Sequence, residues 1–351
     1  MENEEKYIAY VSTYTQKDMH GIHIFDVDMK NGYLNYKSEV QLTNSSYVTI
    51  SHSRKCLYAI TDFGVVAYKI KKDGGLTLMN QASINGMRGC YLSTDYKDKF
   101  LFVAGYHDGK ITVLHLNTDG SVGEIADEVY QKGLGTIAER NSQPHVTCVK
   151  MTRDDKYLLA VDLGMDHTNV YALDNISGKL KLVDVIRSDM NSGPRRVKIS
   201  PDGKFVYIVH ESKSIVDVYS YTEVTPGNPE FEKLQTISTT NDYHAGQTAA
   251  SALNFSTDYK YLVSSNLGDN SATVFEIGKD GLLKKHLCLP ISGEYPKDVA
   301  MFPDNKHLVS LNHESDSMTF FSLDLKKNVM VMHGREIKIE RPNCIIFHKL
   351  S

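Results

Sequence analysis

Five side chains that are positively charged or carry an imidazole stand at the start of β-rich apolar runs, at well-separated points of the chain. They are His145, Arg195 and Lys297, each directly after a proline, together with Arg88 and Arg341. If these runs converge in space, the five groups can concentrate an anionic ligand even though the chain has a net charge of -4. The alternative is an ordinary loop cation that caps a turn or pairs with a surface carboxylate. Arg88 and Arg341, taken alone, fit that alternative better, whereas the shared placement of the other three favours a site.

Glu211 is the carboxylate with the most informative position. It directly follows the apolar run Phe205–His210 and precedes a polar Ser-Lys-Ser segment. At the inner end of a strand it would lie close to the cations and could take a proton from water. A solvated loop position is the commoner fate of a glutamate.

A repeated signal shows which elements must position these residues. A short polar turn with a lysine is followed at once by an apolar run, and this pattern occurs six times. The lysines are Lys55, Lys99, Lys156, Lys204, Lys260 and Lys306. Their spacing is roughly 50 residues, a period typical of propellers, solenoids and arrays.

Each repeat contains one apolar run before the turn and alternating runs after it, separated by Gly-containing turns such as those near Gly120, Gly178 and Gly281. Alternation with period two between such turns predicts antiparallel strands. Four strands per repeat predict propeller blades. Segment 341–348 lacks successors, and the three N-terminal strand segments within 7–40 lack an inner partner, so we expect these ends to form a seventh, shared blade. The predicted fold is an all-β, seven-bladed β-propeller with four antiparallel strands per blade, as a single domain spanning residues 1–351.

Composition excludes several other classes of protein. The charge is mildly acidic and no nucleic-acid-binding signature occurs, so we expect no nucleic acid partner. The five cysteines form no Cys-x-x-Cys pair, and we expect neither a metal nor a cofactor. The first ten residues are acidic and no apolar run could span a bilayer, so we expect a cytoplasmic protein without a membrane partner. The oligomeric state is left open.

Four segments carry a resemblance to a known family. Val11–Thr15 with the following GIHIFDVDMKNGYL, RNSQPHVTCVKMTRDDKYLLAVDLGMD, SGPRRVKISPDGKFVYIVHES and SSNLGDNSATVFEI match its motifs in order. The whole chain resembles the bacterial lactonase family of seven-bladed propellers, which includes one type of 6-phosphogluconolactonase and the fungal carboxy-muconate lactonizing enzyme. Propellers of the Trp-Asp type are excluded because the chain has no tryptophan.

The resemblance implies hydrolysis of a small anionic sugar lactone, with 6-phosphogluconolactone as the expected substrate and the pentose phosphate pathway as the expected context. His145 or Glu211 would be the base that activates water, and the other would orient it or the sugar hydroxyls. Arg195 would hold the oxyanion or the phosphate, and Lys297 would add charge at the phosphate end. Arg196, Arg88 and Arg341 are further expected substrate-binding residues.

Departures from the family motifs keep other functions open. Leu267 stands where the family has arginine, Thr147 where it has a second histidine, and Arg196 and Lys297 where it has histidine and arginine. Arg196 is not expected to replace the missing arginine from the strand of Arg195, because neighbouring strand residues point to opposite faces. A muconate-type lactonizing cycloisomerase and a non-catalytic propeller that binds an anion or a protein are the alternatives.

Overall fold

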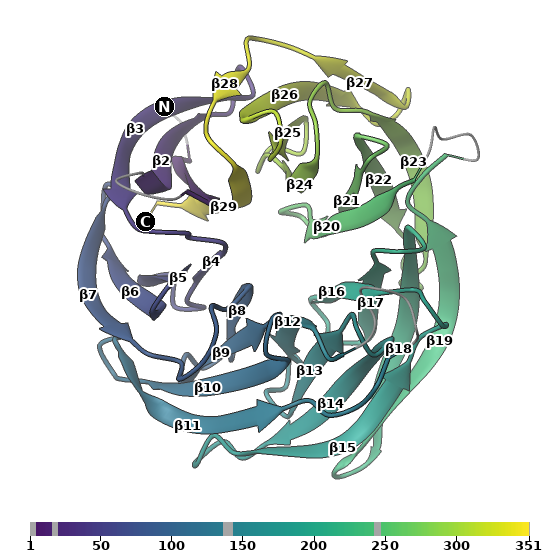
Figure 1. Cartoon of the computed structure of the whole chain (residues 1–351). Helices are drawn as coiled ribbons and strands as arrows, with labels where there is room; N and C mark the ends of the chain where they lie inside the picture. Colours follow the sequence, from purple (N-terminus) through teal and green to yellow (C-terminus); the bar gives the residue numbers. More distant parts are fainter. Residues whose placement is uncertain (1–4, 16–19, 136–142, 242–246, 351) are drawn as a thin grey trace.

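The computed structural model describes residues 5–15, 20–135, 143–241 and 247–350. Within these residues the chain folds into seven antiparallel sheets arranged as the blades of a ring (Figure 1). The predicted all-β, seven-bladed propeller is confirmed. Each blade has four strands in meander order, and the seventh carries one additional short strand.

The first strand of each blade lies nearest the centre of the ring and the fourth lies at its rim (Figure 1). Blade 2 contains β4 (Val48–Ile50), β5 (Cys56–Thr61), β6 (Gly64–Ile70) and β7 (Leu76–Ala82). Blade 3 contains β8 (Tyr91–Thr94), β9 (Phe100–Gly105), β10 (Lys110–Leu116) and β11 (Val122–Tyr130). Blade 4 contains β12 (Val146–Met151), β13 (Tyr157–Asp162), β14 (His167–Leu173) and β15 (Leu180–Arg187).

The remaining complete repeats follow the same plan. Blade 5 contains β16 (Pro194–Ile199), β17 (Phe205–His210), β18 (Ile215–Thr225) and β19 (Asn228–Ser238). Blade 6 contains β20 (Ala249–Phe255), β21 (Tyr261–Leu267), β22 (Ser271–Ile277) and β23 (Leu283–Pro290). Blade 7 contains β24 (Pro296–Met301), β25 (His307–Asn312), β26 (Ser317–Asp324) and β27 (Val329–Met332), and β28 (Ile337–Lys338) pairs with β26.

Blade 1 joins the two ends of the chain, as the end segments predicted. Its strands are β29 (Pro342–Lys349), β1 (Tyr7–Thr13), β2 (His20–Asp28) and β3 (Tyr33–Gln41), in that order from the centre. The antiparallel pairing of β1 with β29 runs from Tyr7 opposite Lys349 to Thr13 opposite Pro342. This ladder closes the ring, so neither strand is left with an unpaired inner edge.

The repeated polar turn has one backbone feature in common. In all six copies the residue before the lysine has a positive φ: Arg54, Asp98, Asp155, Gly203, Tyr259 and Asn305. Such a residue reverses the chain tightly between the first and second strand of a blade. The turn therefore fixes how the inner strand is placed in every repeat, although only one copy uses glycine.

The apolar core lies between neighbouring blades. For example, Val11 and Phe25 of blade 1 pack in one buried cluster with Leu311 and Phe320 of blade 7. The apolar residues of the alternating strands thus face the adjacent sheet. The inner ends of the strands are left free to carry polar groups.

Across the described ranges, no helix has the length and apolar character needed to cross a membrane.

Candidate active site

A cavity of about 380 Å³ is formed where the inner strands begin. Its lining comes from blades 1, 2, 3, 4, 5 and 7, and it includes four cationic side chains and one carboxylate: Arg88, Arg195, Arg196, Lys297 and Glu211. Because residues from all these blades converge here, the centre of the ring collects groups that are far apart in the sequence.

A β-bulge explains which side chains reach the cavity. In blades 4, 5, 7 and 1 the inner strand has one residue that is skipped by the pairing with its neighbour. The skipped residues are Thr147, Arg195, Lys297 and Asn343, and all four line the cavity. A bulge interrupts the alternation of the strand and re-aims the side chain beside it.

This bulge corrects one expectation from the sequence. Arg195 and Arg196 are adjacent, and strict alternation would place them on opposite faces of β16. The register shifts between Pro194 and Arg196, however, and both arginines line the cavity.

Arg195 and Glu211 form an ion pair within the cavity lining. Glu211 follows β17, and its backbone N–H donates to the carbonyl of Gly193 at 2.7 Å. Only 6% of Glu211 is exposed, and the Nε of Arg195 is buried with no hydrogen-bond partner among the described residues. The carboxylate is therefore held firmly, and the guanidinium keeps donor capacity beyond the pair.

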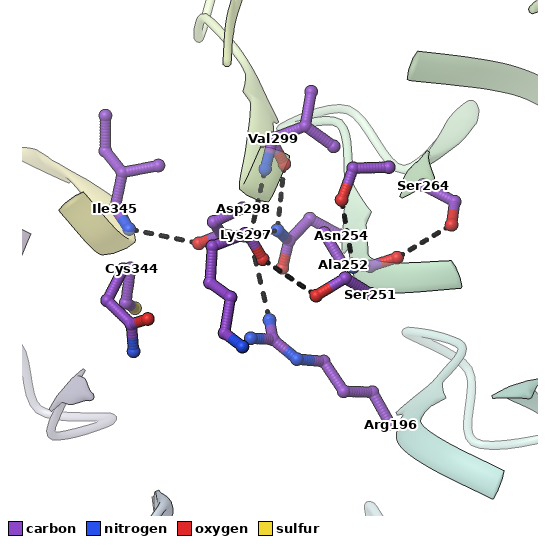
Figure 2. Close-up of polar contacts among 12 residues, drawn as sticks. Arg196, Ser251, Ala252, Asn254, Ser264, Lys297, Asp298, Val299, Cys344 and Ile345 are labelled. Carbon is purple, nitrogen blue, oxygen red and sulfur yellow. Dashed lines mark hydrogen bonds and ion pairs between the residues drawn. The ribbon is translucent and has the colours of Figure 1, made fainter. Parts of the chain in front are cut away.

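Arg196 is held from across the ring by Asp298 of β24 (Figure 2). Its Nη1 lies 3.6 Å from Asp298 Oδ1, and its guanidinium lies over the Tyr47 ring, 5.4 Å from the centroid. Asp298 also accepts hydrogen bonds from Asn254 Nδ2 at 2.8 Å and from the backbone N–H of Ile345 at 3.0 Å. One carboxylate thus connects blades 5, 6, 7 and 1 beneath the cavity.

Lys297 lies beside this network (Figure 2). Its Nζ is 5.3 Å from the centroid of the Tyr295 ring. Burial, followed by the positive charge of Arg195, lowers the pKa of Lys297 from 10.5 to about 7. Its ammonium group is therefore much easier to deprotonate than that of an exposed lysine.

Arg88 completes the set of cavity cations. Its guanidinium lies 3.0 Å from Asp62 and stacks over the Tyr14 ring at 4.6 Å from the centroid. The pairing with Asp62 is the ordinary role weighed for this residue in the sequence, yet the side chain also lines the cavity.

His145 does not line the cavity. Its ring stacks on Tyr106 with centroids 4.3 Å apart, and its Nδ1 lies 2.6 Å from the Tyr106 carbonyl oxygen. The residue of blade 4 that corresponds to Arg195 is Thr147, because Pro144 stands two residues earlier in the register than Pro194. The Pro-x pattern therefore identified His145, which lies two residues before the bulged position of blade 4.

Two other sequence positions also fall outside the lining. Arg341 is exposed, has a positive φ, and donates its backbone N–H to Asp316 Oδ1 at 2.8 Å. Leu267 is buried at the end of β21 and contributes nothing to the cavity surface. Arg140, which begins one of the motifs that resemble the family, lies outside the described residues.

Several cavity residues were missed in the sequence: Tyr14, Tyr47, Tyr91, Tyr106, Tyr295, His313 and Asn343. Asn343 directly follows Pro342 and could have been found by the same pattern that identified Arg195 and Lys297. His313 follows β25 as Glu211 follows β17, and burial and Lys297 lower its pKa. The tyrosines carry no local signal, because the chain has 21 tyrosines and nothing in their sequence neighbourhood marks those of the cavity.

The arrangement suits one kind of chemistry. A carboxylate beside guanidinium groups can take a proton from water, while the cations stabilise negative charge on a substrate or an oxyanion. Aromatic walls give apolar contact for a sugar-sized ring.

Comparison with known proteins shows the family and the fold of the chain. Residues 8–347 match the family model described as "Lactonase, 7-bladed beta-propeller". The chain is similar to a 6-phosphogluconolactonase of Bacillus subtilis, at 30% identity over 97% of this chain and 98% of the relative. It is also similar to an uncharacterized protein of Staphylococcus saprophyticus, at 31% identity over 93% and 95% of the two chains.

Among solved structures, a putative 6-phosphogluconolactonase of Bacteroides fragilis superposes with a TM-score of 0.87 at 27% identity, covering 99% of both chains. A periplasmic gluconolactonase of Pseudomonas aeruginosa superposes with a TM-score of 0.90 at 24% identity, covering 99% of this chain and 100% of the other, which shows the shared fold. With its seven blades and a family match over nearly its whole length, the chain belongs to the lactonase family of seven-bladed β-propellers.

Proposed function

We propose that this protein hydrolyses an anionic sugar lactone, with 6-phosphogluconolactone as its substrate, as part of the pentose phosphate pathway in the cytoplasm. The observation that carries the proposal is the cavity that Glu211 lines together with Arg88, Arg195, Arg196 and Lys297. A single carboxylate among four cations fits a negatively charged substrate that must be attacked by water.

In the proposed reaction Glu211 takes a proton from a water molecule, and the resulting hydroxide adds to the lactone carbonyl carbon. The ring C–O bond then breaks, the ring oxygen takes up a proton, and the carboxylic acid product releases one. Arg195, paired with Glu211, orients the carboxylate and donates to the developing oxyanion. Arg196 binds the phosphate, since a planar guanidinium can donate two parallel hydrogen bonds to it.

His145 receives a different role from the one that its place in the sequence favoured. Its stacking on Tyr106 makes it a positioning residue for that wall of the cavity. Arg88 borders the substrate, and Arg341 is assigned no contact with it. No group of three or more His, Cys, Asp or Glu side chains within the described ranges could hold a metal ion, and the proposed steps use none.

The test is hydrolysis of freshly prepared 6-phosphogluconolactone, corrected for its spontaneous rate, beside unphosphorylated gluconolactone. We expect faster turnover of the phosphorylated lactone and no change after exhaustive chelation. Equal rates on both lactones would show that the protein does not recognise the phosphate group of the substrate. Loss of activity on chelation, restored by a divalent ion, would contradict the metal-free mechanism.

A further inference from the structure

Lys297 differs from the three other cations that line the cavity. Each arginine has a carboxylate partner: Arg88 has Asp62, Arg195 has Glu211, and Arg196 has Asp298. In the part of the chain that the structure describes, Lys297 has no carboxylate within ion-pair distance. Its amine is thus the one cavity cation whose charge is not fixed by a partner in those residues.

The position of Lys297 is nevertheless well defined. It is the bulged residue of β24, and its carbonyl accepts a hydrogen bond from Ser251 Oγ of blade 6 at 3.1 Å (Figure 2). The carbonyl of the preceding Pro296 accepts from Ser265 Oγ at 2.6 Å. These contacts anchor the backbone on both sides of the residue, so the side chain begins from a rigid point.

Charged and titratable groups from blades 3, 5 and 7 lie near Lys297. Arg195 and Arg196 of β16 and Cys90 beside β8 act on it, and Glu211 is the opposing carboxylate. His313, after β25, is affected in turn by the charge of Lys297. Burial, followed by the positive charge of Arg195, favours the neutral amine and lowers the pKa of Lys297 to about 7, although Glu211 opposes the shift.

We propose that Lys297 is the catalytic acid of this cavity and gives a proton to the ring oxygen of the lactone as the C–O bond breaks. This role rests on the proposed hydrolysis. Glu211 removes the proton of the attacking water, and Lys297 supplies the proton that the leaving alkoxide needs. The neutral amine regains a proton through solvent from Glu211, and the acid product releases one proton overall.

A lysine at this position has a chemical consequence that an arginine would not have. Arginine stays protonated at any working pH and cannot release a proton to an alkoxide. An acid whose pKa lies near the working pH transfers a proton and recovers it most efficiently. The site therefore holds a charge that can be given up during the reaction.

The decisive variants are Lys297→Arg, which keeps the positive charge, and Lys297→Met, which keeps the length and removes it. For the wild type we expect kcat to fall as the pH rises through about 7. Both variants should lose about 10²-fold in kcat and should lack this descending limb. Circular dichroism and thermal melting of each variant serve as controls for folding.

A second measurement does not depend on activity. Competitive acetylation at a series of pH values, read by mass spectrometry, reports the protonation of Lys297, with exposed Lys72 as the internal reference for the reagent. We expect the reactivity of Lys297 to reach half of its maximum near pH 7.

The outcomes separate the two proposals. If the wild type hydrolyses no lactone, the proposed function fails and this role fails with it. If the wild type is active and Lys297→Arg keeps its rate and pH profile, the role of Lys297 alone is overturned. A labelling midpoint near that of a fully solvated lysine would also overturn it, whatever the activity.

Discussion

Blade 5 contains two carboxylates only a few residues apart, and their surroundings differ in one decisive respect. Glu211 lines the cavity and pairs with Arg195. Asp217 on β18 is 1% exposed and is enclosed by His210 Nε2 at 3.2 Å and Lys233 Nζ at 2.9 Å. Both carboxylates are buried and paired with a cation, so burial and pairing do not distinguish a reactive group from a structural one.

The two carboxylates differ in whether a substrate in the cavity can reach the groups around them. Ser192 Oγ lies 3.1 Å from His210 Nδ1, and His210 in turn contacts Asp217, so Ser, His and Asp form a connected chain. Their types and contacts are those of a nucleophile with its base. Ser192 and His210 are fully buried, however, and neither lines the cavity. A substrate cannot reach them, and the chain of contacts serves the stability of the blade.

The strongest test of this contrast is Glu211→Gln. The substitution keeps the shape of the side chain but removes the proposed base, so we expect kcat to fall by about 10²–10⁴. The midpoint of thermal unfolding should change little, because Arg195 faces a solvent-accessible cavity. Lactone hydrolysis and melting are measured on the same sample. The exposed Glu294→Gln is the matched control, and full activity of Glu211→Gln would place the chemistry elsewhere.

Asp217→Asn should behave in the opposite way. Loss of this carboxylate leaves Lys233 and His210 without their buried counter-charge, which should lower the free energy of unfolding by ~3 kcal/mol. Urea denaturation measures this effect. The kcat of the folded variant should match that of the wild type, and a large loss of kcat without a loss of stability would erase the distinction between the two carboxylates.

The pH dependence of stability provides a third test. Burial alone would raise the pKa of Asp217, but its contacts with His210, Lys233 and Thr236 lower it from 3.8 to about 2. Its stabilising contribution is therefore complete above about pH 4 and is lost as the pH falls towards 2, by ~2 kcal/mol in total.

The wild type and Asp217→Asn should accordingly differ less in unfolding free energy at about pH 3 than at about pH 6. The comparison uses the variant because burial raises the pKa of Asp162 to about 6, which contributes with the opposite sign. A difference that stays constant across this range would mean that the Asp217 carboxylate does not titrate as inferred.

The smallest effect is expected for Asp298→Asn. Asp298 shares features of both carboxylates, because it lies outside the cavity lining but contacts a residue of that lining. Asp298 is as buried as Asp217, but it holds Arg196 at the cavity. We expect KM to rise about tenfold with a smaller change in kcat, because a binding group is displaced rather than removed. Arg196→Lys should reproduce the effect, and the two changes together should be less than additive. Additive effects would show that Asp298 does not act through Arg196.

The fold and much of the cation set follow from local features of the amino-acid sequence. The repeated lysine turns predicted the blades, and the unpartnered end segments predicted the shared blade. The Pro-x pattern identified Arg195 and Lys297, which line the cavity, and the end of the Phe205–His210 run identified Glu211. These features are local, since turn chemistry and strand alternation depend on residues close together in the chain.

Which side chains share the cavity depends on the folded ring and on the strand register within it. A bulge shifts the register by one residue, and the sequence does not show which residue is skipped. The sequence therefore pointed to His145 rather than to Thr147, and strict alternation gave no reason for Arg195 and Arg196 to line the same cavity. The contact of Arg196 with Asp298 joins blades that are distant in sequence and exists only once the ring is closed. The low pKa of Lys297 has the same origin, because burial and the charge of Arg195 act on it through space, from another blade.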